Sequence, residues 1–267
     1  MPRFEPIDDP GDPRIEAYRD VRERDLVGRQ GLFVAEGEVV LGRLIGSERF
    51  RTVSALVDRR RLDKLAPMLA RLGDEVPVFC ADRGVFDEIA GFPMHRGILG
   101  LGALEPAVAA TDLLAGLGPD ALVLALFAIA NHDNLGGIFR NAAAFGVDAV
   151  ILDGQCCDPL YRKALRVSVG GALQVPYART APGEDLPALL ASQGFEPLAL
   201  TPAGDTPLAQ VRPAGRTAVL LGAEGPGLPP EVIAAAKAVS IPMAAGFDSL
   251  NVATTSGIVL HHLTRGR

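Results

Sequence analysis

Short apolar runs alternate with helix-type segments along the second half of the chain. The apolar runs predict strands at residues 121–127, 149–152, 197–200, 218–221 and 238–241. Apolar residues at helical spacing predict helices at residues 137–145, 159–167, 186–193, 230–237 and 251–263. Near-continuous apolar strands separated by helices are typical of a parallel sheet with helices on both faces. The second half is therefore predicted to be an α/β domain.

The first 105 residues show the same alternation over shorter segments. Strand patterns occur at residues 31–35, 53–57, 76–80 and 97–104. Helix patterns occur at residues 14–24, 36–45, 62–72 and 84–90. Residues 105–119 are then rich in Ala, Pro and Gly, with one short helix pattern at residues 112–115. We predict a small α/β domain over residues 1–105 and a second domain over residues 106–267.

Length and composition fit two ordinary globular domains. The chain has 267 residues, of which 48% are hydrophobic and 22% are charged. No apolar run approaches the roughly 20 residues of a membrane-spanning helix, and no apolar signal segment opens the chain. The three cysteines, of which Cys156 and Cys157 are adjacent, form neither a disulfide framework nor a zinc pattern. We therefore expect a protein of the reducing cytoplasm.

Net charge gives weak guidance on a nucleic-acid partner. The net charge of −6 disfavours a polyanion, but phosphate binding depends on local groups of Lys and Arg. Three such groups occur: Arg14, Arg19, Arg22, Arg24 and Arg29; Arg49, Arg51, Arg59, Arg60, Arg61 and Lys64; and Arg162, Lys163 and Arg166. Each group is either a phosphate-binding surface or a solvated helix face, since acidic residues are interleaved with the first two.

Several common catalytic signatures are missing. No G-x-G-x-x-G follows a predicted strand, and neither the G-x-x-x-x-G-K-[ST] loop nor the G-x-S-x-G elbow occurs. The histidines lack the spacing to carboxylates that a metal site needs. The sequence thus does not point to hydride transfer, phosphoryl transfer or metal-dependent hydrolysis.

Segment 131–141 places polar residues and glycines where a buried strand leads into a helix. Asp133 or Asn134 can cap that helix, and the glycines leave room for a ligand beside the backbone. Arg140 falls in the first turn of the predicted helix, where a cation is electrostatically unfavourable. It is therefore either a functional residue or one that is paired with a nearby carboxylate.

Two further segments place small and polar residues after a predicted strand. Residues 220–228 carry Glu224 among three glycines, which suits either a tight turn or a ligand-binding loop. Residues 241–252 lead from a strand through a loop to Ser249 and Asn251 at a helix start. Helix capping would explain Ser249 but not the other residues of segment 241–252.

Taken together, these segments resemble the SpoU/TrmH family of RNA 2′-O-methyltransferases, within the SPOUT superfamily. The resemblance spans about residues 113–263. Its motifs are N-x-G-x-x-x-R at 134–140, L-G-x-E-G-x-G-L at 221–228, I-P-M at 241–243 and S-L-N-V at 249–252. Residues 34–37 (Val-Ala-Glu-Gly) are more weakly similar to the small α/β RNA-recognition domain that many members carry.

The resemblance implies a fold, a cofactor and partners. In the family, the C-terminal part of the sheet forms a deep trefoil knot that binds S-adenosylmethionine largely through backbone groups, without a metal. On this chain the cofactor would contact Gly222, Ile241 and Leu250, with Thr201 and Met243 nearby. Members are typically homodimers that pair through the knotted domain, and RNA is expected to cross the dimer.

The resemblance also implies a catalytic set, which is Asn134, Arg140, Glu224, Ser249 and Asn251. A ribose 2′-hydroxyl is a poor nucleophile, so the protein has to orient it toward the methyl group and assist loss of its proton. We expect Arg140 to contact the hydroxyl and the adjacent phosphate, although a guanidinium normally stays protonated. Ser249 and Asn251 would position the nucleotide or Arg140. Asn134 and Glu224 would hold the loops by hydrogen bonds.

Two positions depart from the family pattern. Ala253 stands where the family often has Ser, and Asn131-His132 replaces the usual entry to the first motif. Our leading prediction is an RNA 2′-O-methyltransferase, with rRNA favoured over tRNA because a separate N-terminal domain suits a folded site. The alternatives are a knotted protein that binds RNA or cofactor without turnover, and an α/β enzyme for another nucleotide or sugar phosphate.

Overall fold

The computed structural model describes residues 3–19, 23–90, 97–212, 215–245, 247 and 249–265. It divides into two compact units. The first unit consists of Met1–Pro106 and Leu160–Gln174, and the second of Ala107–Pro159 and Val175–Arg267. Residues 160–174, which the sequence analysis assigned to the second domain, thus group with the first unit.

The first unit contains a five-stranded mixed sheet with the strand order β1-β4-β3-β5-β2. Its strands are β1 (Arg3–Ile7), β2 (Leu32–Glu36), β3 (Phe50–Asp58), β4 (Pro77–Ala81) and β5 (Ile98–Leu104). β1, β4 and β3 run parallel, whereas β5 is antiparallel to both of its neighbours. The sequence analysis missed β1, because this short strand contains charged residues and Pro6, which an edge strand tolerates.

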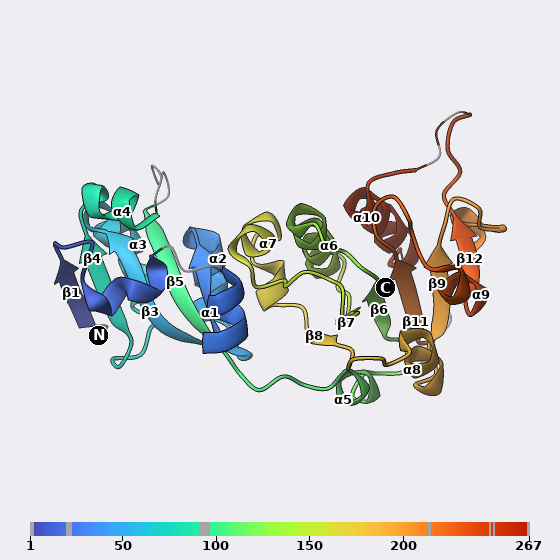
Figure 1. Cartoon of the computed structure of the whole chain (residues 1–267), viewed down its shortest axis with the longest axis horizontal. Coiled ribbons are helices and arrows are strands. Elements are labelled where there is room, and N and C mark those ends of the chain that lie inside the picture. The colour runs from blue at the N-terminus through green and yellow to red at the C-terminus, as the bar shows by residue number, and fades with distance from the viewer. Residues whose placement is uncertain are drawn as a thin grey trace. The chain divides into compact units, whose positions relative to one another are not determined.

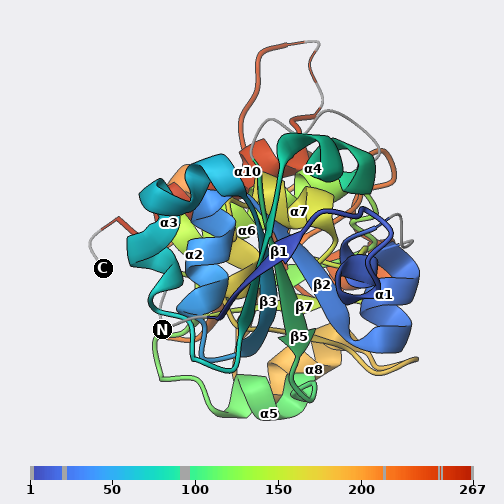
Figure 2. The same cartoon turned by 90° about the vertical axis from the view of Figure 1, so that its left-hand side faces the viewer.

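Helices lie on both sides of this sheet. They are α1 (Glu23–Gln30), α2 (Glu38–Ile45), α3 (Leu62–Leu69), α4 (Arg83–Ala90) and α7 (Arg162–Val167), with 3-10 turns at η1 (Pro13–Tyr18), η2 (Arg59–Arg61) and η3 (Gly171–Leu173). Figure 2 shows α2 and α3 on one side of the strands and α1 on the other. Ile15 of η1 and Phe86 and Ile89 of α4 share a core with Leu56 and Leu99 of the sheet.

The predicted helix over residues 14–24 is wrong. The chain forms a 3-10 turn that ends at Tyr18, and α1 is a separate helix; residues 20–22 lie outside the described part. Ile15 and Tyr18 are both buried, and their spacing is the three-residue repeat of a 3-10 helix. Burial of these two side chains against the sheet therefore decides the local structure.

The second unit contains a seven-stranded sheet, ordered β10-β12-β9-β11-β6-β7-β8, in which the strand pairs run parallel. Its strands are β6 (Leu122–Leu126), β7 (Ala149–Leu152), β8 (Tyr177–Arg179), β9 (Glu196–Leu200), β10 (Thr206–Pro207), β11 (Thr217–Leu221) and β12 (Lys237–Ser240). The strands predicted for this half are present, each to within one residue at its ends. β8 and β10 were missed because edge strands this short carry no readable pattern.

Helices cover both faces of this second sheet. They are α5 (Ala110–Ala115), α6 (His132–Ala144), α8 (Leu186–Ser192), α9 (Pro230–Ala234) and α10 (Val252–Leu263), with a 3-10 turn at η4 (Leu208–Gln210). Figure 1 shows α6 and α10 on one side of the strands and α5 and α8 on the other. The predicted parallel α/β fold is therefore confirmed, whereas the trefoil knot stays a prediction.

Two predicted helices of the second half are too long. α9 ends at Ala234, and Lys237 already pairs with Leu198 as the first residue of β12. α7 begins at Arg162, three residues later than predicted. In the described part of the chain, every helix falls short of the length and apolarity that a bilayer crossing requires.

Gly102 of β5 provides a test of the first unit's core. A Cβ at this position would lie 2.3 Å from Cζ of the fully buried Phe33 ring. Because the ring has no space to move aside, we expect Gly102→Ala to lower the free energy of unfolding by about 1–3 kcal/mol in urea denaturation. Gly84→Ala in α4 is the control, since a Cβ there meets nothing within 4 Å. An equal decrease in the free energy of unfolding of the Gly102→Ala and Gly84→Ala variants would contradict this packing.

Candidate active site

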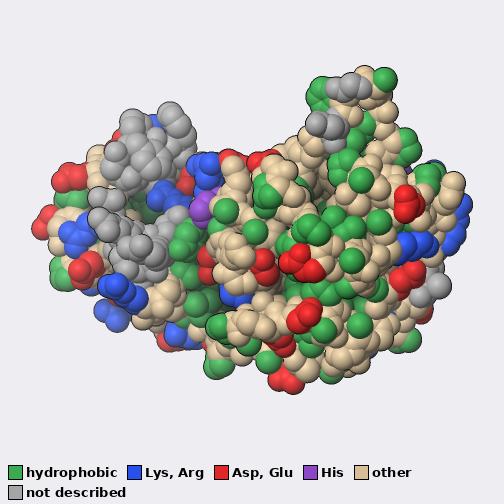
Figure 3. All heavy atoms as spheres, turned by 45° about the vertical axis from the view of Figure 1, so that its right-hand side comes forward, with side chains coloured by type: hydrophobic (Ala, Val, Ile, Leu, Met, Phe, Trp, Pro, Cys, Tyr) green, Lys and Arg blue, Asp and Glu red, His purple; other side chains and the backbone are tan. Residues whose placement is uncertain are grey.

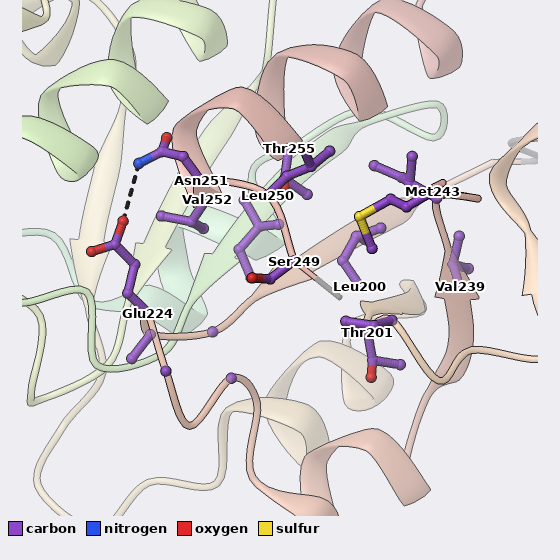
Figure 4. Close-up of a pocket in the computed structure, with 17 residues that line it drawn as sticks. Leu200, Thr201, Glu224, Val239, Met243, Ser249, Leu250, Asn251, Val252 and Thr255 are labelled. Atoms are coloured by element: carbon purple, nitrogen blue, oxygen red, sulfur yellow. Dashed lines mark hydrogen bonds between the residues drawn. The ribbon is translucent and has the colours of Figure 1, made fainter. Parts of the chain in front are cut away.

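A pocket of about 490 Å³ opens at the carboxyl ends of β9, β11 and β12 (Figure 4). Ligands of parallel α/β sheets bind at this edge, and the volume is that of a small-molecule site. Figure 4 shows side chains from the loops after these strands and from the start of α10 around one hollow. The lining residues are Leu200, Thr201, Pro202, Leu221, Gly222, Ala223, Glu224, Gly225, Gly227, Val239, Ile241, Met243, Ser249, Leu250, Asn251, Val252 and Thr255.

Most of the predicted site residues line this pocket. The eight that do so are Thr201, Gly222, Glu224, Ile241, Met243, Ser249, Leu250 and Asn251. Asn134 and Arg140, both on α6, are outside the lining. The sequence analysis missed Leu200 and Val239, which it placed only in predicted strands, and it counted Leu221 in a motif but not among the cofactor-binding residues. Their position at the carboxyl ends of parallel strands is the signal that could have found them.

Close backbone packing explains the glycines after β11. A Cβ at Gly222 would lie 2.2 Å from the carbonyl carbon of Gly227, so no larger residue fits there. Gly227 N donates a hydrogen bond to Ala223 O at 3.0 Å, and Gly225 has a positive φ of 88°. The segment is therefore a tight turn that also lines the pocket, and it carries Glu224 exposed at its tip.

The side-chain amide of Asn251 connects the three predicted motifs. Its Oδ1 caps α10 by accepting hydrogen bonds from Ala253 N at 3.0 Å and Thr254 N at 3.1 Å. Its Nδ2 donates to Asn134 Oδ1 at 2.8 Å and to Glu224 Oε1 at 3.0 Å, and Figure 4 marks the second bond. Both N–H donors of the amide are thus used. The cap of α10 is Asn251 and not Ser249.

α6 begins earlier than predicted. Its cap is Asn131, whose Oδ1 accepts a hydrogen bond from Asp133 N at 2.8 Å. The predicted start at residue 137 is wrong because residues 132–136, Gly136 included, already lie inside the helix, and the cap is neither Asp133 nor Asn134. Arg140 consequently lies in mid-helix, so the electrostatic argument based on a first-turn position does not apply.

Arg140 is an exposed side chain beside the α6–α10 contact. It forms no hydrogen bond or ion pair within the described residues, so the carboxylate partner considered as an alternative is absent there. Its neighbour Asn141 faces α10, where Nδ2 donates to Ala253 O at 2.7 Å and to Ser256 Oγ at 2.9 Å. Adjacent helix positions are about 100° apart, so Arg140 flanks the face that contacts α10.

Small residues let α6 and α10 approach closely. A Cβ at Gly137 would lie 2.7 Å from Cβ of Ala253, and one at Gly257 would lie 3.2 Å from Asn141 Nδ2. Ala253, which departs from the family pattern, is thus a packing residue of this contact. The same contact sets where Asn134, on α6, meets Asn251, at the start of α10.

The loop from β12 to α10 stands out from the second unit (Figures 1 and 3). Phe247 in this loop is 70% exposed, and Met243 and Leu250 on either side of it line the pocket. Gly246 and Asp248 lie outside the described residues. The loop between two pocket-lining residues therefore exposes a large apolar side chain to solvent.

Cys156 supports the segment that leads into α6. Its Sγ accepts a hydrogen bond from Ile129 N at 3.3 Å and donates one to Leu126 O at 3.4 Å. Burial, reinforced by the charge of Asp153, raises the pKa of Cys156 to about 12, and burial raises the pKa of Cys157 to about 11. Both groups stay protonated at neutral pH, which makes them poor nucleophiles.

Comparison with known proteins identifies the family. The pattern of the SpoU rRNA Methylase family matches residues 121–261. An uncharacterized tRNA/rRNA methyltransferase of Mycobacterium tuberculosis is 40% identical over 267 residues, which cover 96% of this chain and 90% of the relative. The chain belongs to the SpoU rRNA methylase family. The resemblance seen in the sequence motifs is thereby confirmed.

The comparison also finds a relative with a named activity and a solved structure of the same fold. A 23S rRNA (guanosine-2′-O-)-methyltransferase of Acinetobacter baylyi is 30% identical over 227 residues, which cover 82% of this chain and 91% of the relative. The crystal structure of an AdoMet-bound rRNA methyltransferase from Sinorhizobium meliloti has a TM-score of 0.82 at 23% identity, with 98% of both chains covered. The SpoU methylase therefore shares the fold of that structure along nearly its whole length.

The Gly137–Ala253 contact predicts a rescue between two substitutions. We expect Gly137→Ala to lower the free energy of unfolding of the SpoU methylase by about 1–3 kcal/mol, because its methyl group meets Ala253. Ala253→Gly removes the opposing methyl group at a cost of about 1 kcal/mol for a helical glycine. The double variant should therefore be more stable than the two separate losses imply. Purely additive losses in urea denaturation would contradict the contact.

The buried thiols predict a pH dependence of stability. Above the ordinary thiol pKa of about 8.5 the unfolded chain ionises, whereas the folded chain keeps both protons until about pH 11 or 12. The free energy of unfolding should thus fall by about 1.4 kcal/mol per pH unit above pH 8.5 for the buried Cys156 thiol, and by less for the half-buried Cys157 thiol, which solvent partly stabilises in its ionised form. We expect Cys156→Ala to make this fall shallower in unfolding measured from pH 8 to 11. If the free energy of unfolding falls with pH equally steeply in wild type and in Cys156→Ala, burial of the Cys156 thiol does not govern the pH dependence of stability.

Proposed function

We propose that the SpoU methylase transfers the methyl group of S-adenosylmethionine to a ribose 2′-hydroxyl of RNA at the pocket edge near α6. The observation that carries this proposal is the Asn251 amide, which joins polar groups of three motifs at the lip of one pocket. Family membership gives the reaction class, and the named activity of the Acinetobacter baylyi relative gives the ribose 2′-oxygen as acceptor.

The pocket fits S-adenosylmethionine in chemistry and size. Its walls combine loop backbone and apolar side chains with a few polar ones, Glu224 being the only charged residue of the lining. These walls suit an adenosine and a cationic sulfonium chain better than an anionic cofactor. Gly222, Ile241 and Leu250 would hold the cofactor, with Thr201 and Met243 beside it. Bound there, S-adenosylmethionine supplies a methyl group already activated on a sulfonium.

The polar residues at the lip divide into those that touch RNA and those that position others. The Asn251 amide is fully engaged, so it acts as a scaffold that fixes Asn134 and Glu224. Arg140 has its guanidinium exposed and makes no ion pair within the described part, which leaves its donors for the 2′-hydroxyl and the adjacent phosphate. A guanidinium stabilises the developing oxyanion without acting as the base. The hydroxyl proton would therefore pass to solvent water as the oxygen–methyl bond forms and the sulfonium–methyl bond breaks. Ser249 would orient the nucleotide.

Charge is divided unequally between the two units. The second unit holds seven of the 26 Lys and Arg residues and 13 of the 32 Asp and Glu residues. The first unit therefore holds 19 basic and 19 acidic residues. The entire net charge of −6 therefore belongs to the second unit. Within it, Arg179, Arg212 and Arg216 are engaged with backbone carbonyls. An exposed Arg140 in so acidic a unit is best explained by a contact with phosphate.

The proposal extends to the RNA class, the assembly and the location. rRNA is favoured over tRNA, because a separate first unit suits recognition of a folded site. A homodimer that pairs through the second unit is supported by the exposed apolar side chains Ile258 of α10 and Leu250, each 39% exposed. A cytoplasmic location follows from the RNA substrate. Mapping 2′-O-methylation across total RNA from a deletion strain and its parent tests the proposal, and an unchanged map would refute it.

Arg140→Ala tests the assigned role. We expect methyl transfer to fall by at least a factor of 100, because the guanidinium proposed to contact the 2′-hydroxyl and the adjacent phosphate is removed. The Kd for S-adenosylmethionine by calorimetry should stay within about twofold of wild type, since Arg140 lies outside the pocket lining. Arg265→Ala is the matched control, as another exposed arginine of the same unit. Wild-type turnover by the Arg140→Ala variant would refute the role.

A further inference from the structure

A short link, residues 127–131, joins the end of β6 to the start of α6 and contains a left-handed residue. β6 ends at Leu126, and α6 begins at His132. Within the link, Ala128 has a positive φ of 53°. This conformation is uncommon and unfavourable for a residue with a Cβ. Strained backbone of this kind persists only where the surrounding contacts hold it in place.

The contact that holds Ala128 comes from the turn after β7, residues 153–157, which we call the Asp153 turn. Oδ2 of Asp153 accepts a hydrogen bond from Ala128 N at 2.9 Å. The other carboxylate oxygen, Oδ1, accepts hydrogen bonds from Gln155 N and Cys156 N, both at 2.9 Å. The carboxylate therefore shapes its own turn with one oxygen and holds Ala128 with the other.

Ile129 is bound to the same turn through both of its backbone polar groups. Its N donates a hydrogen bond to Cys156 Sγ at 3.3 Å, and its O accepts one from Cys157 N at 2.9 Å. Together with the bond from Ala128, these bonds fix two successive residues of the link to the Asp153 turn. The direction in which the chain enters α6 is therefore set by this turn.

Arg179, the last residue of β8, holds the Asp153 turn in its turn. Its guanidinium donates to three backbone carbonyls: Nη1 to Asp153 O at 2.7 Å and to Cys156 O at 2.9 Å, and Nη2 to Cys157 O at 3.2 Å. β8, β7 and β6 are neighbours in the sheet. The contacts thus run across the carboxyl ends of three adjacent strands, from Arg179 through the Asp153 turn to the link before α6.

The link leads directly to the residues of α6 at the candidate site. It ends at Asn131, which caps α6. One turn later, the buried Asn134 accepts the hydrogen bond from Asn251 at 2.8 Å. Arg140, the proposed contact of the 2′-hydroxyl, lies on the same helix. A displacement of the helix start would therefore shift Asn134 and Arg140 relative to the cofactor pocket.

We propose that Asp153 is a positioning residue for methyl transfer, which holds Ala128 in its left-handed conformation and thereby sets where α6 presents Asn134 and Arg140. This inference rests on the proposed function, because it takes both α6 residues as part of the reaction site. Asp153 lies outside the pocket lining, so it acts through the backbone of the link. Reaction rates respond strongly to such placement, since a shift of about 1 Å can cost about a factor of 100.

A carboxylate at the opposite end of the same strand pair provides a matched comparison. Asp148, just before β7, accepts a hydrogen bond from Leu122 N, at the start of β6, at 2.7 Å. Asp148 and Asp153 thus both join the β7 side of the sheet to the backbone of the β6 segment. The same kind of bond is present at both ends of one strand pair, and only the Asp153 end leads into α6.

The test compares Asp153→Asn with Asp148→Asn in the full chain, in a methyl-transfer assay with total RNA from a deletion strain as the acceptor. An Asn has one acceptor oxygen, so at position 153 it serves either the donors of the turn or Ala128 N. For Asp153→Asn we expect kcat to fall about tenfold, with the KM for S-adenosylmethionine within about twofold of wild type. For Asp148→Asn we expect a wild-type kcat and KM, although both variants should lower the urea midpoint of unfolding.

Ala128→Gly tests whether Asp153 acts through Ala128. Glycine adopts a positive φ without a steric cost, so the link then keeps its conformation without help from the carboxylate. In the Asp153→Asn background we therefore expect Ala128→Gly to raise kcat at least about threefold. The comparison is made where circular dichroism shows every variant to be folded, so that the recovery reports the conformation of the link and not the folded fraction.

Three results would overturn the proposal. A wild-type kcat in Asp153→Asn, while Arg140→Ala still lowers methyl transfer, would leave the proposed function standing and make the Asp153 turn only structural. An equal loss of kcat in Asp148→Asn would indicate a general effect of a lost backbone bond. No recovery by Ala128→Gly would show that Asp153 does not act through this residue.

Cys156→Ala replaces Asp153→Asn if the latter does not fold. It removes the thiol that binds Ile129 N and leaves the carboxylate in place. A kcat about threefold lower than wild type, at an unchanged KM for S-adenosylmethionine, would support the proposal. A wild-type kcat would overturn it.

Discussion

The hydrogen bonds from the Asn251 amide to Asn134 and Glu224 hold the candidate site together. The amide oxygen is committed to capping α10, and this leaves the nitrogen a single orientation toward the other two motifs. α6, the turn after β11 and the start of α10 are far apart in the sequence, and they meet only because the parallel sheet brings strand ends to one edge. The geometry at the pocket lip therefore depends on α10 keeping its distance from α6, which the small residues Gly137 and Ala253 make short.

Most of the second unit could be predicted from the sequence because its buried strands are continuous apolar runs. Those runs give the strands of the sheet centre to within one residue. The short strands β8 and β10 have too few residues for a pattern, and β1 is an edge strand in which charge is tolerated. The start of α6 was predicted too late, because two adjacent glycines are unusual inside a helix and nothing in a sequence shows that a second helix will pack against Gly137.

The candidate site also contains both residues that the sequence could predict and residues that it could not. Motif residues such as Gly222 and Asn251 were predictable because they are unusual choices for a core. Leu200 and Val239 were not, since an apolar residue in or at the end of a strand looks the same whether it faces the core or a pocket. The ion pairs of the buried Glu36 with Arg162 and Arg166 of α7 could not be predicted either. They depend on α7 packing with the first unit, and the sequence analysis had ended that unit at residue 105.

The placement of α7 also limits how the protein can be divided. Because Leu160–Gln174 groups with the first unit, the backbone passes from one unit to the other three times. A chain cut near Pro106 would separate Glu36 from both of its arginines and leave a buried carboxylate without a counter-charge. The two units are thus not interchangeable modules, and exchange of the first unit between relatives would have to carry α7 with it.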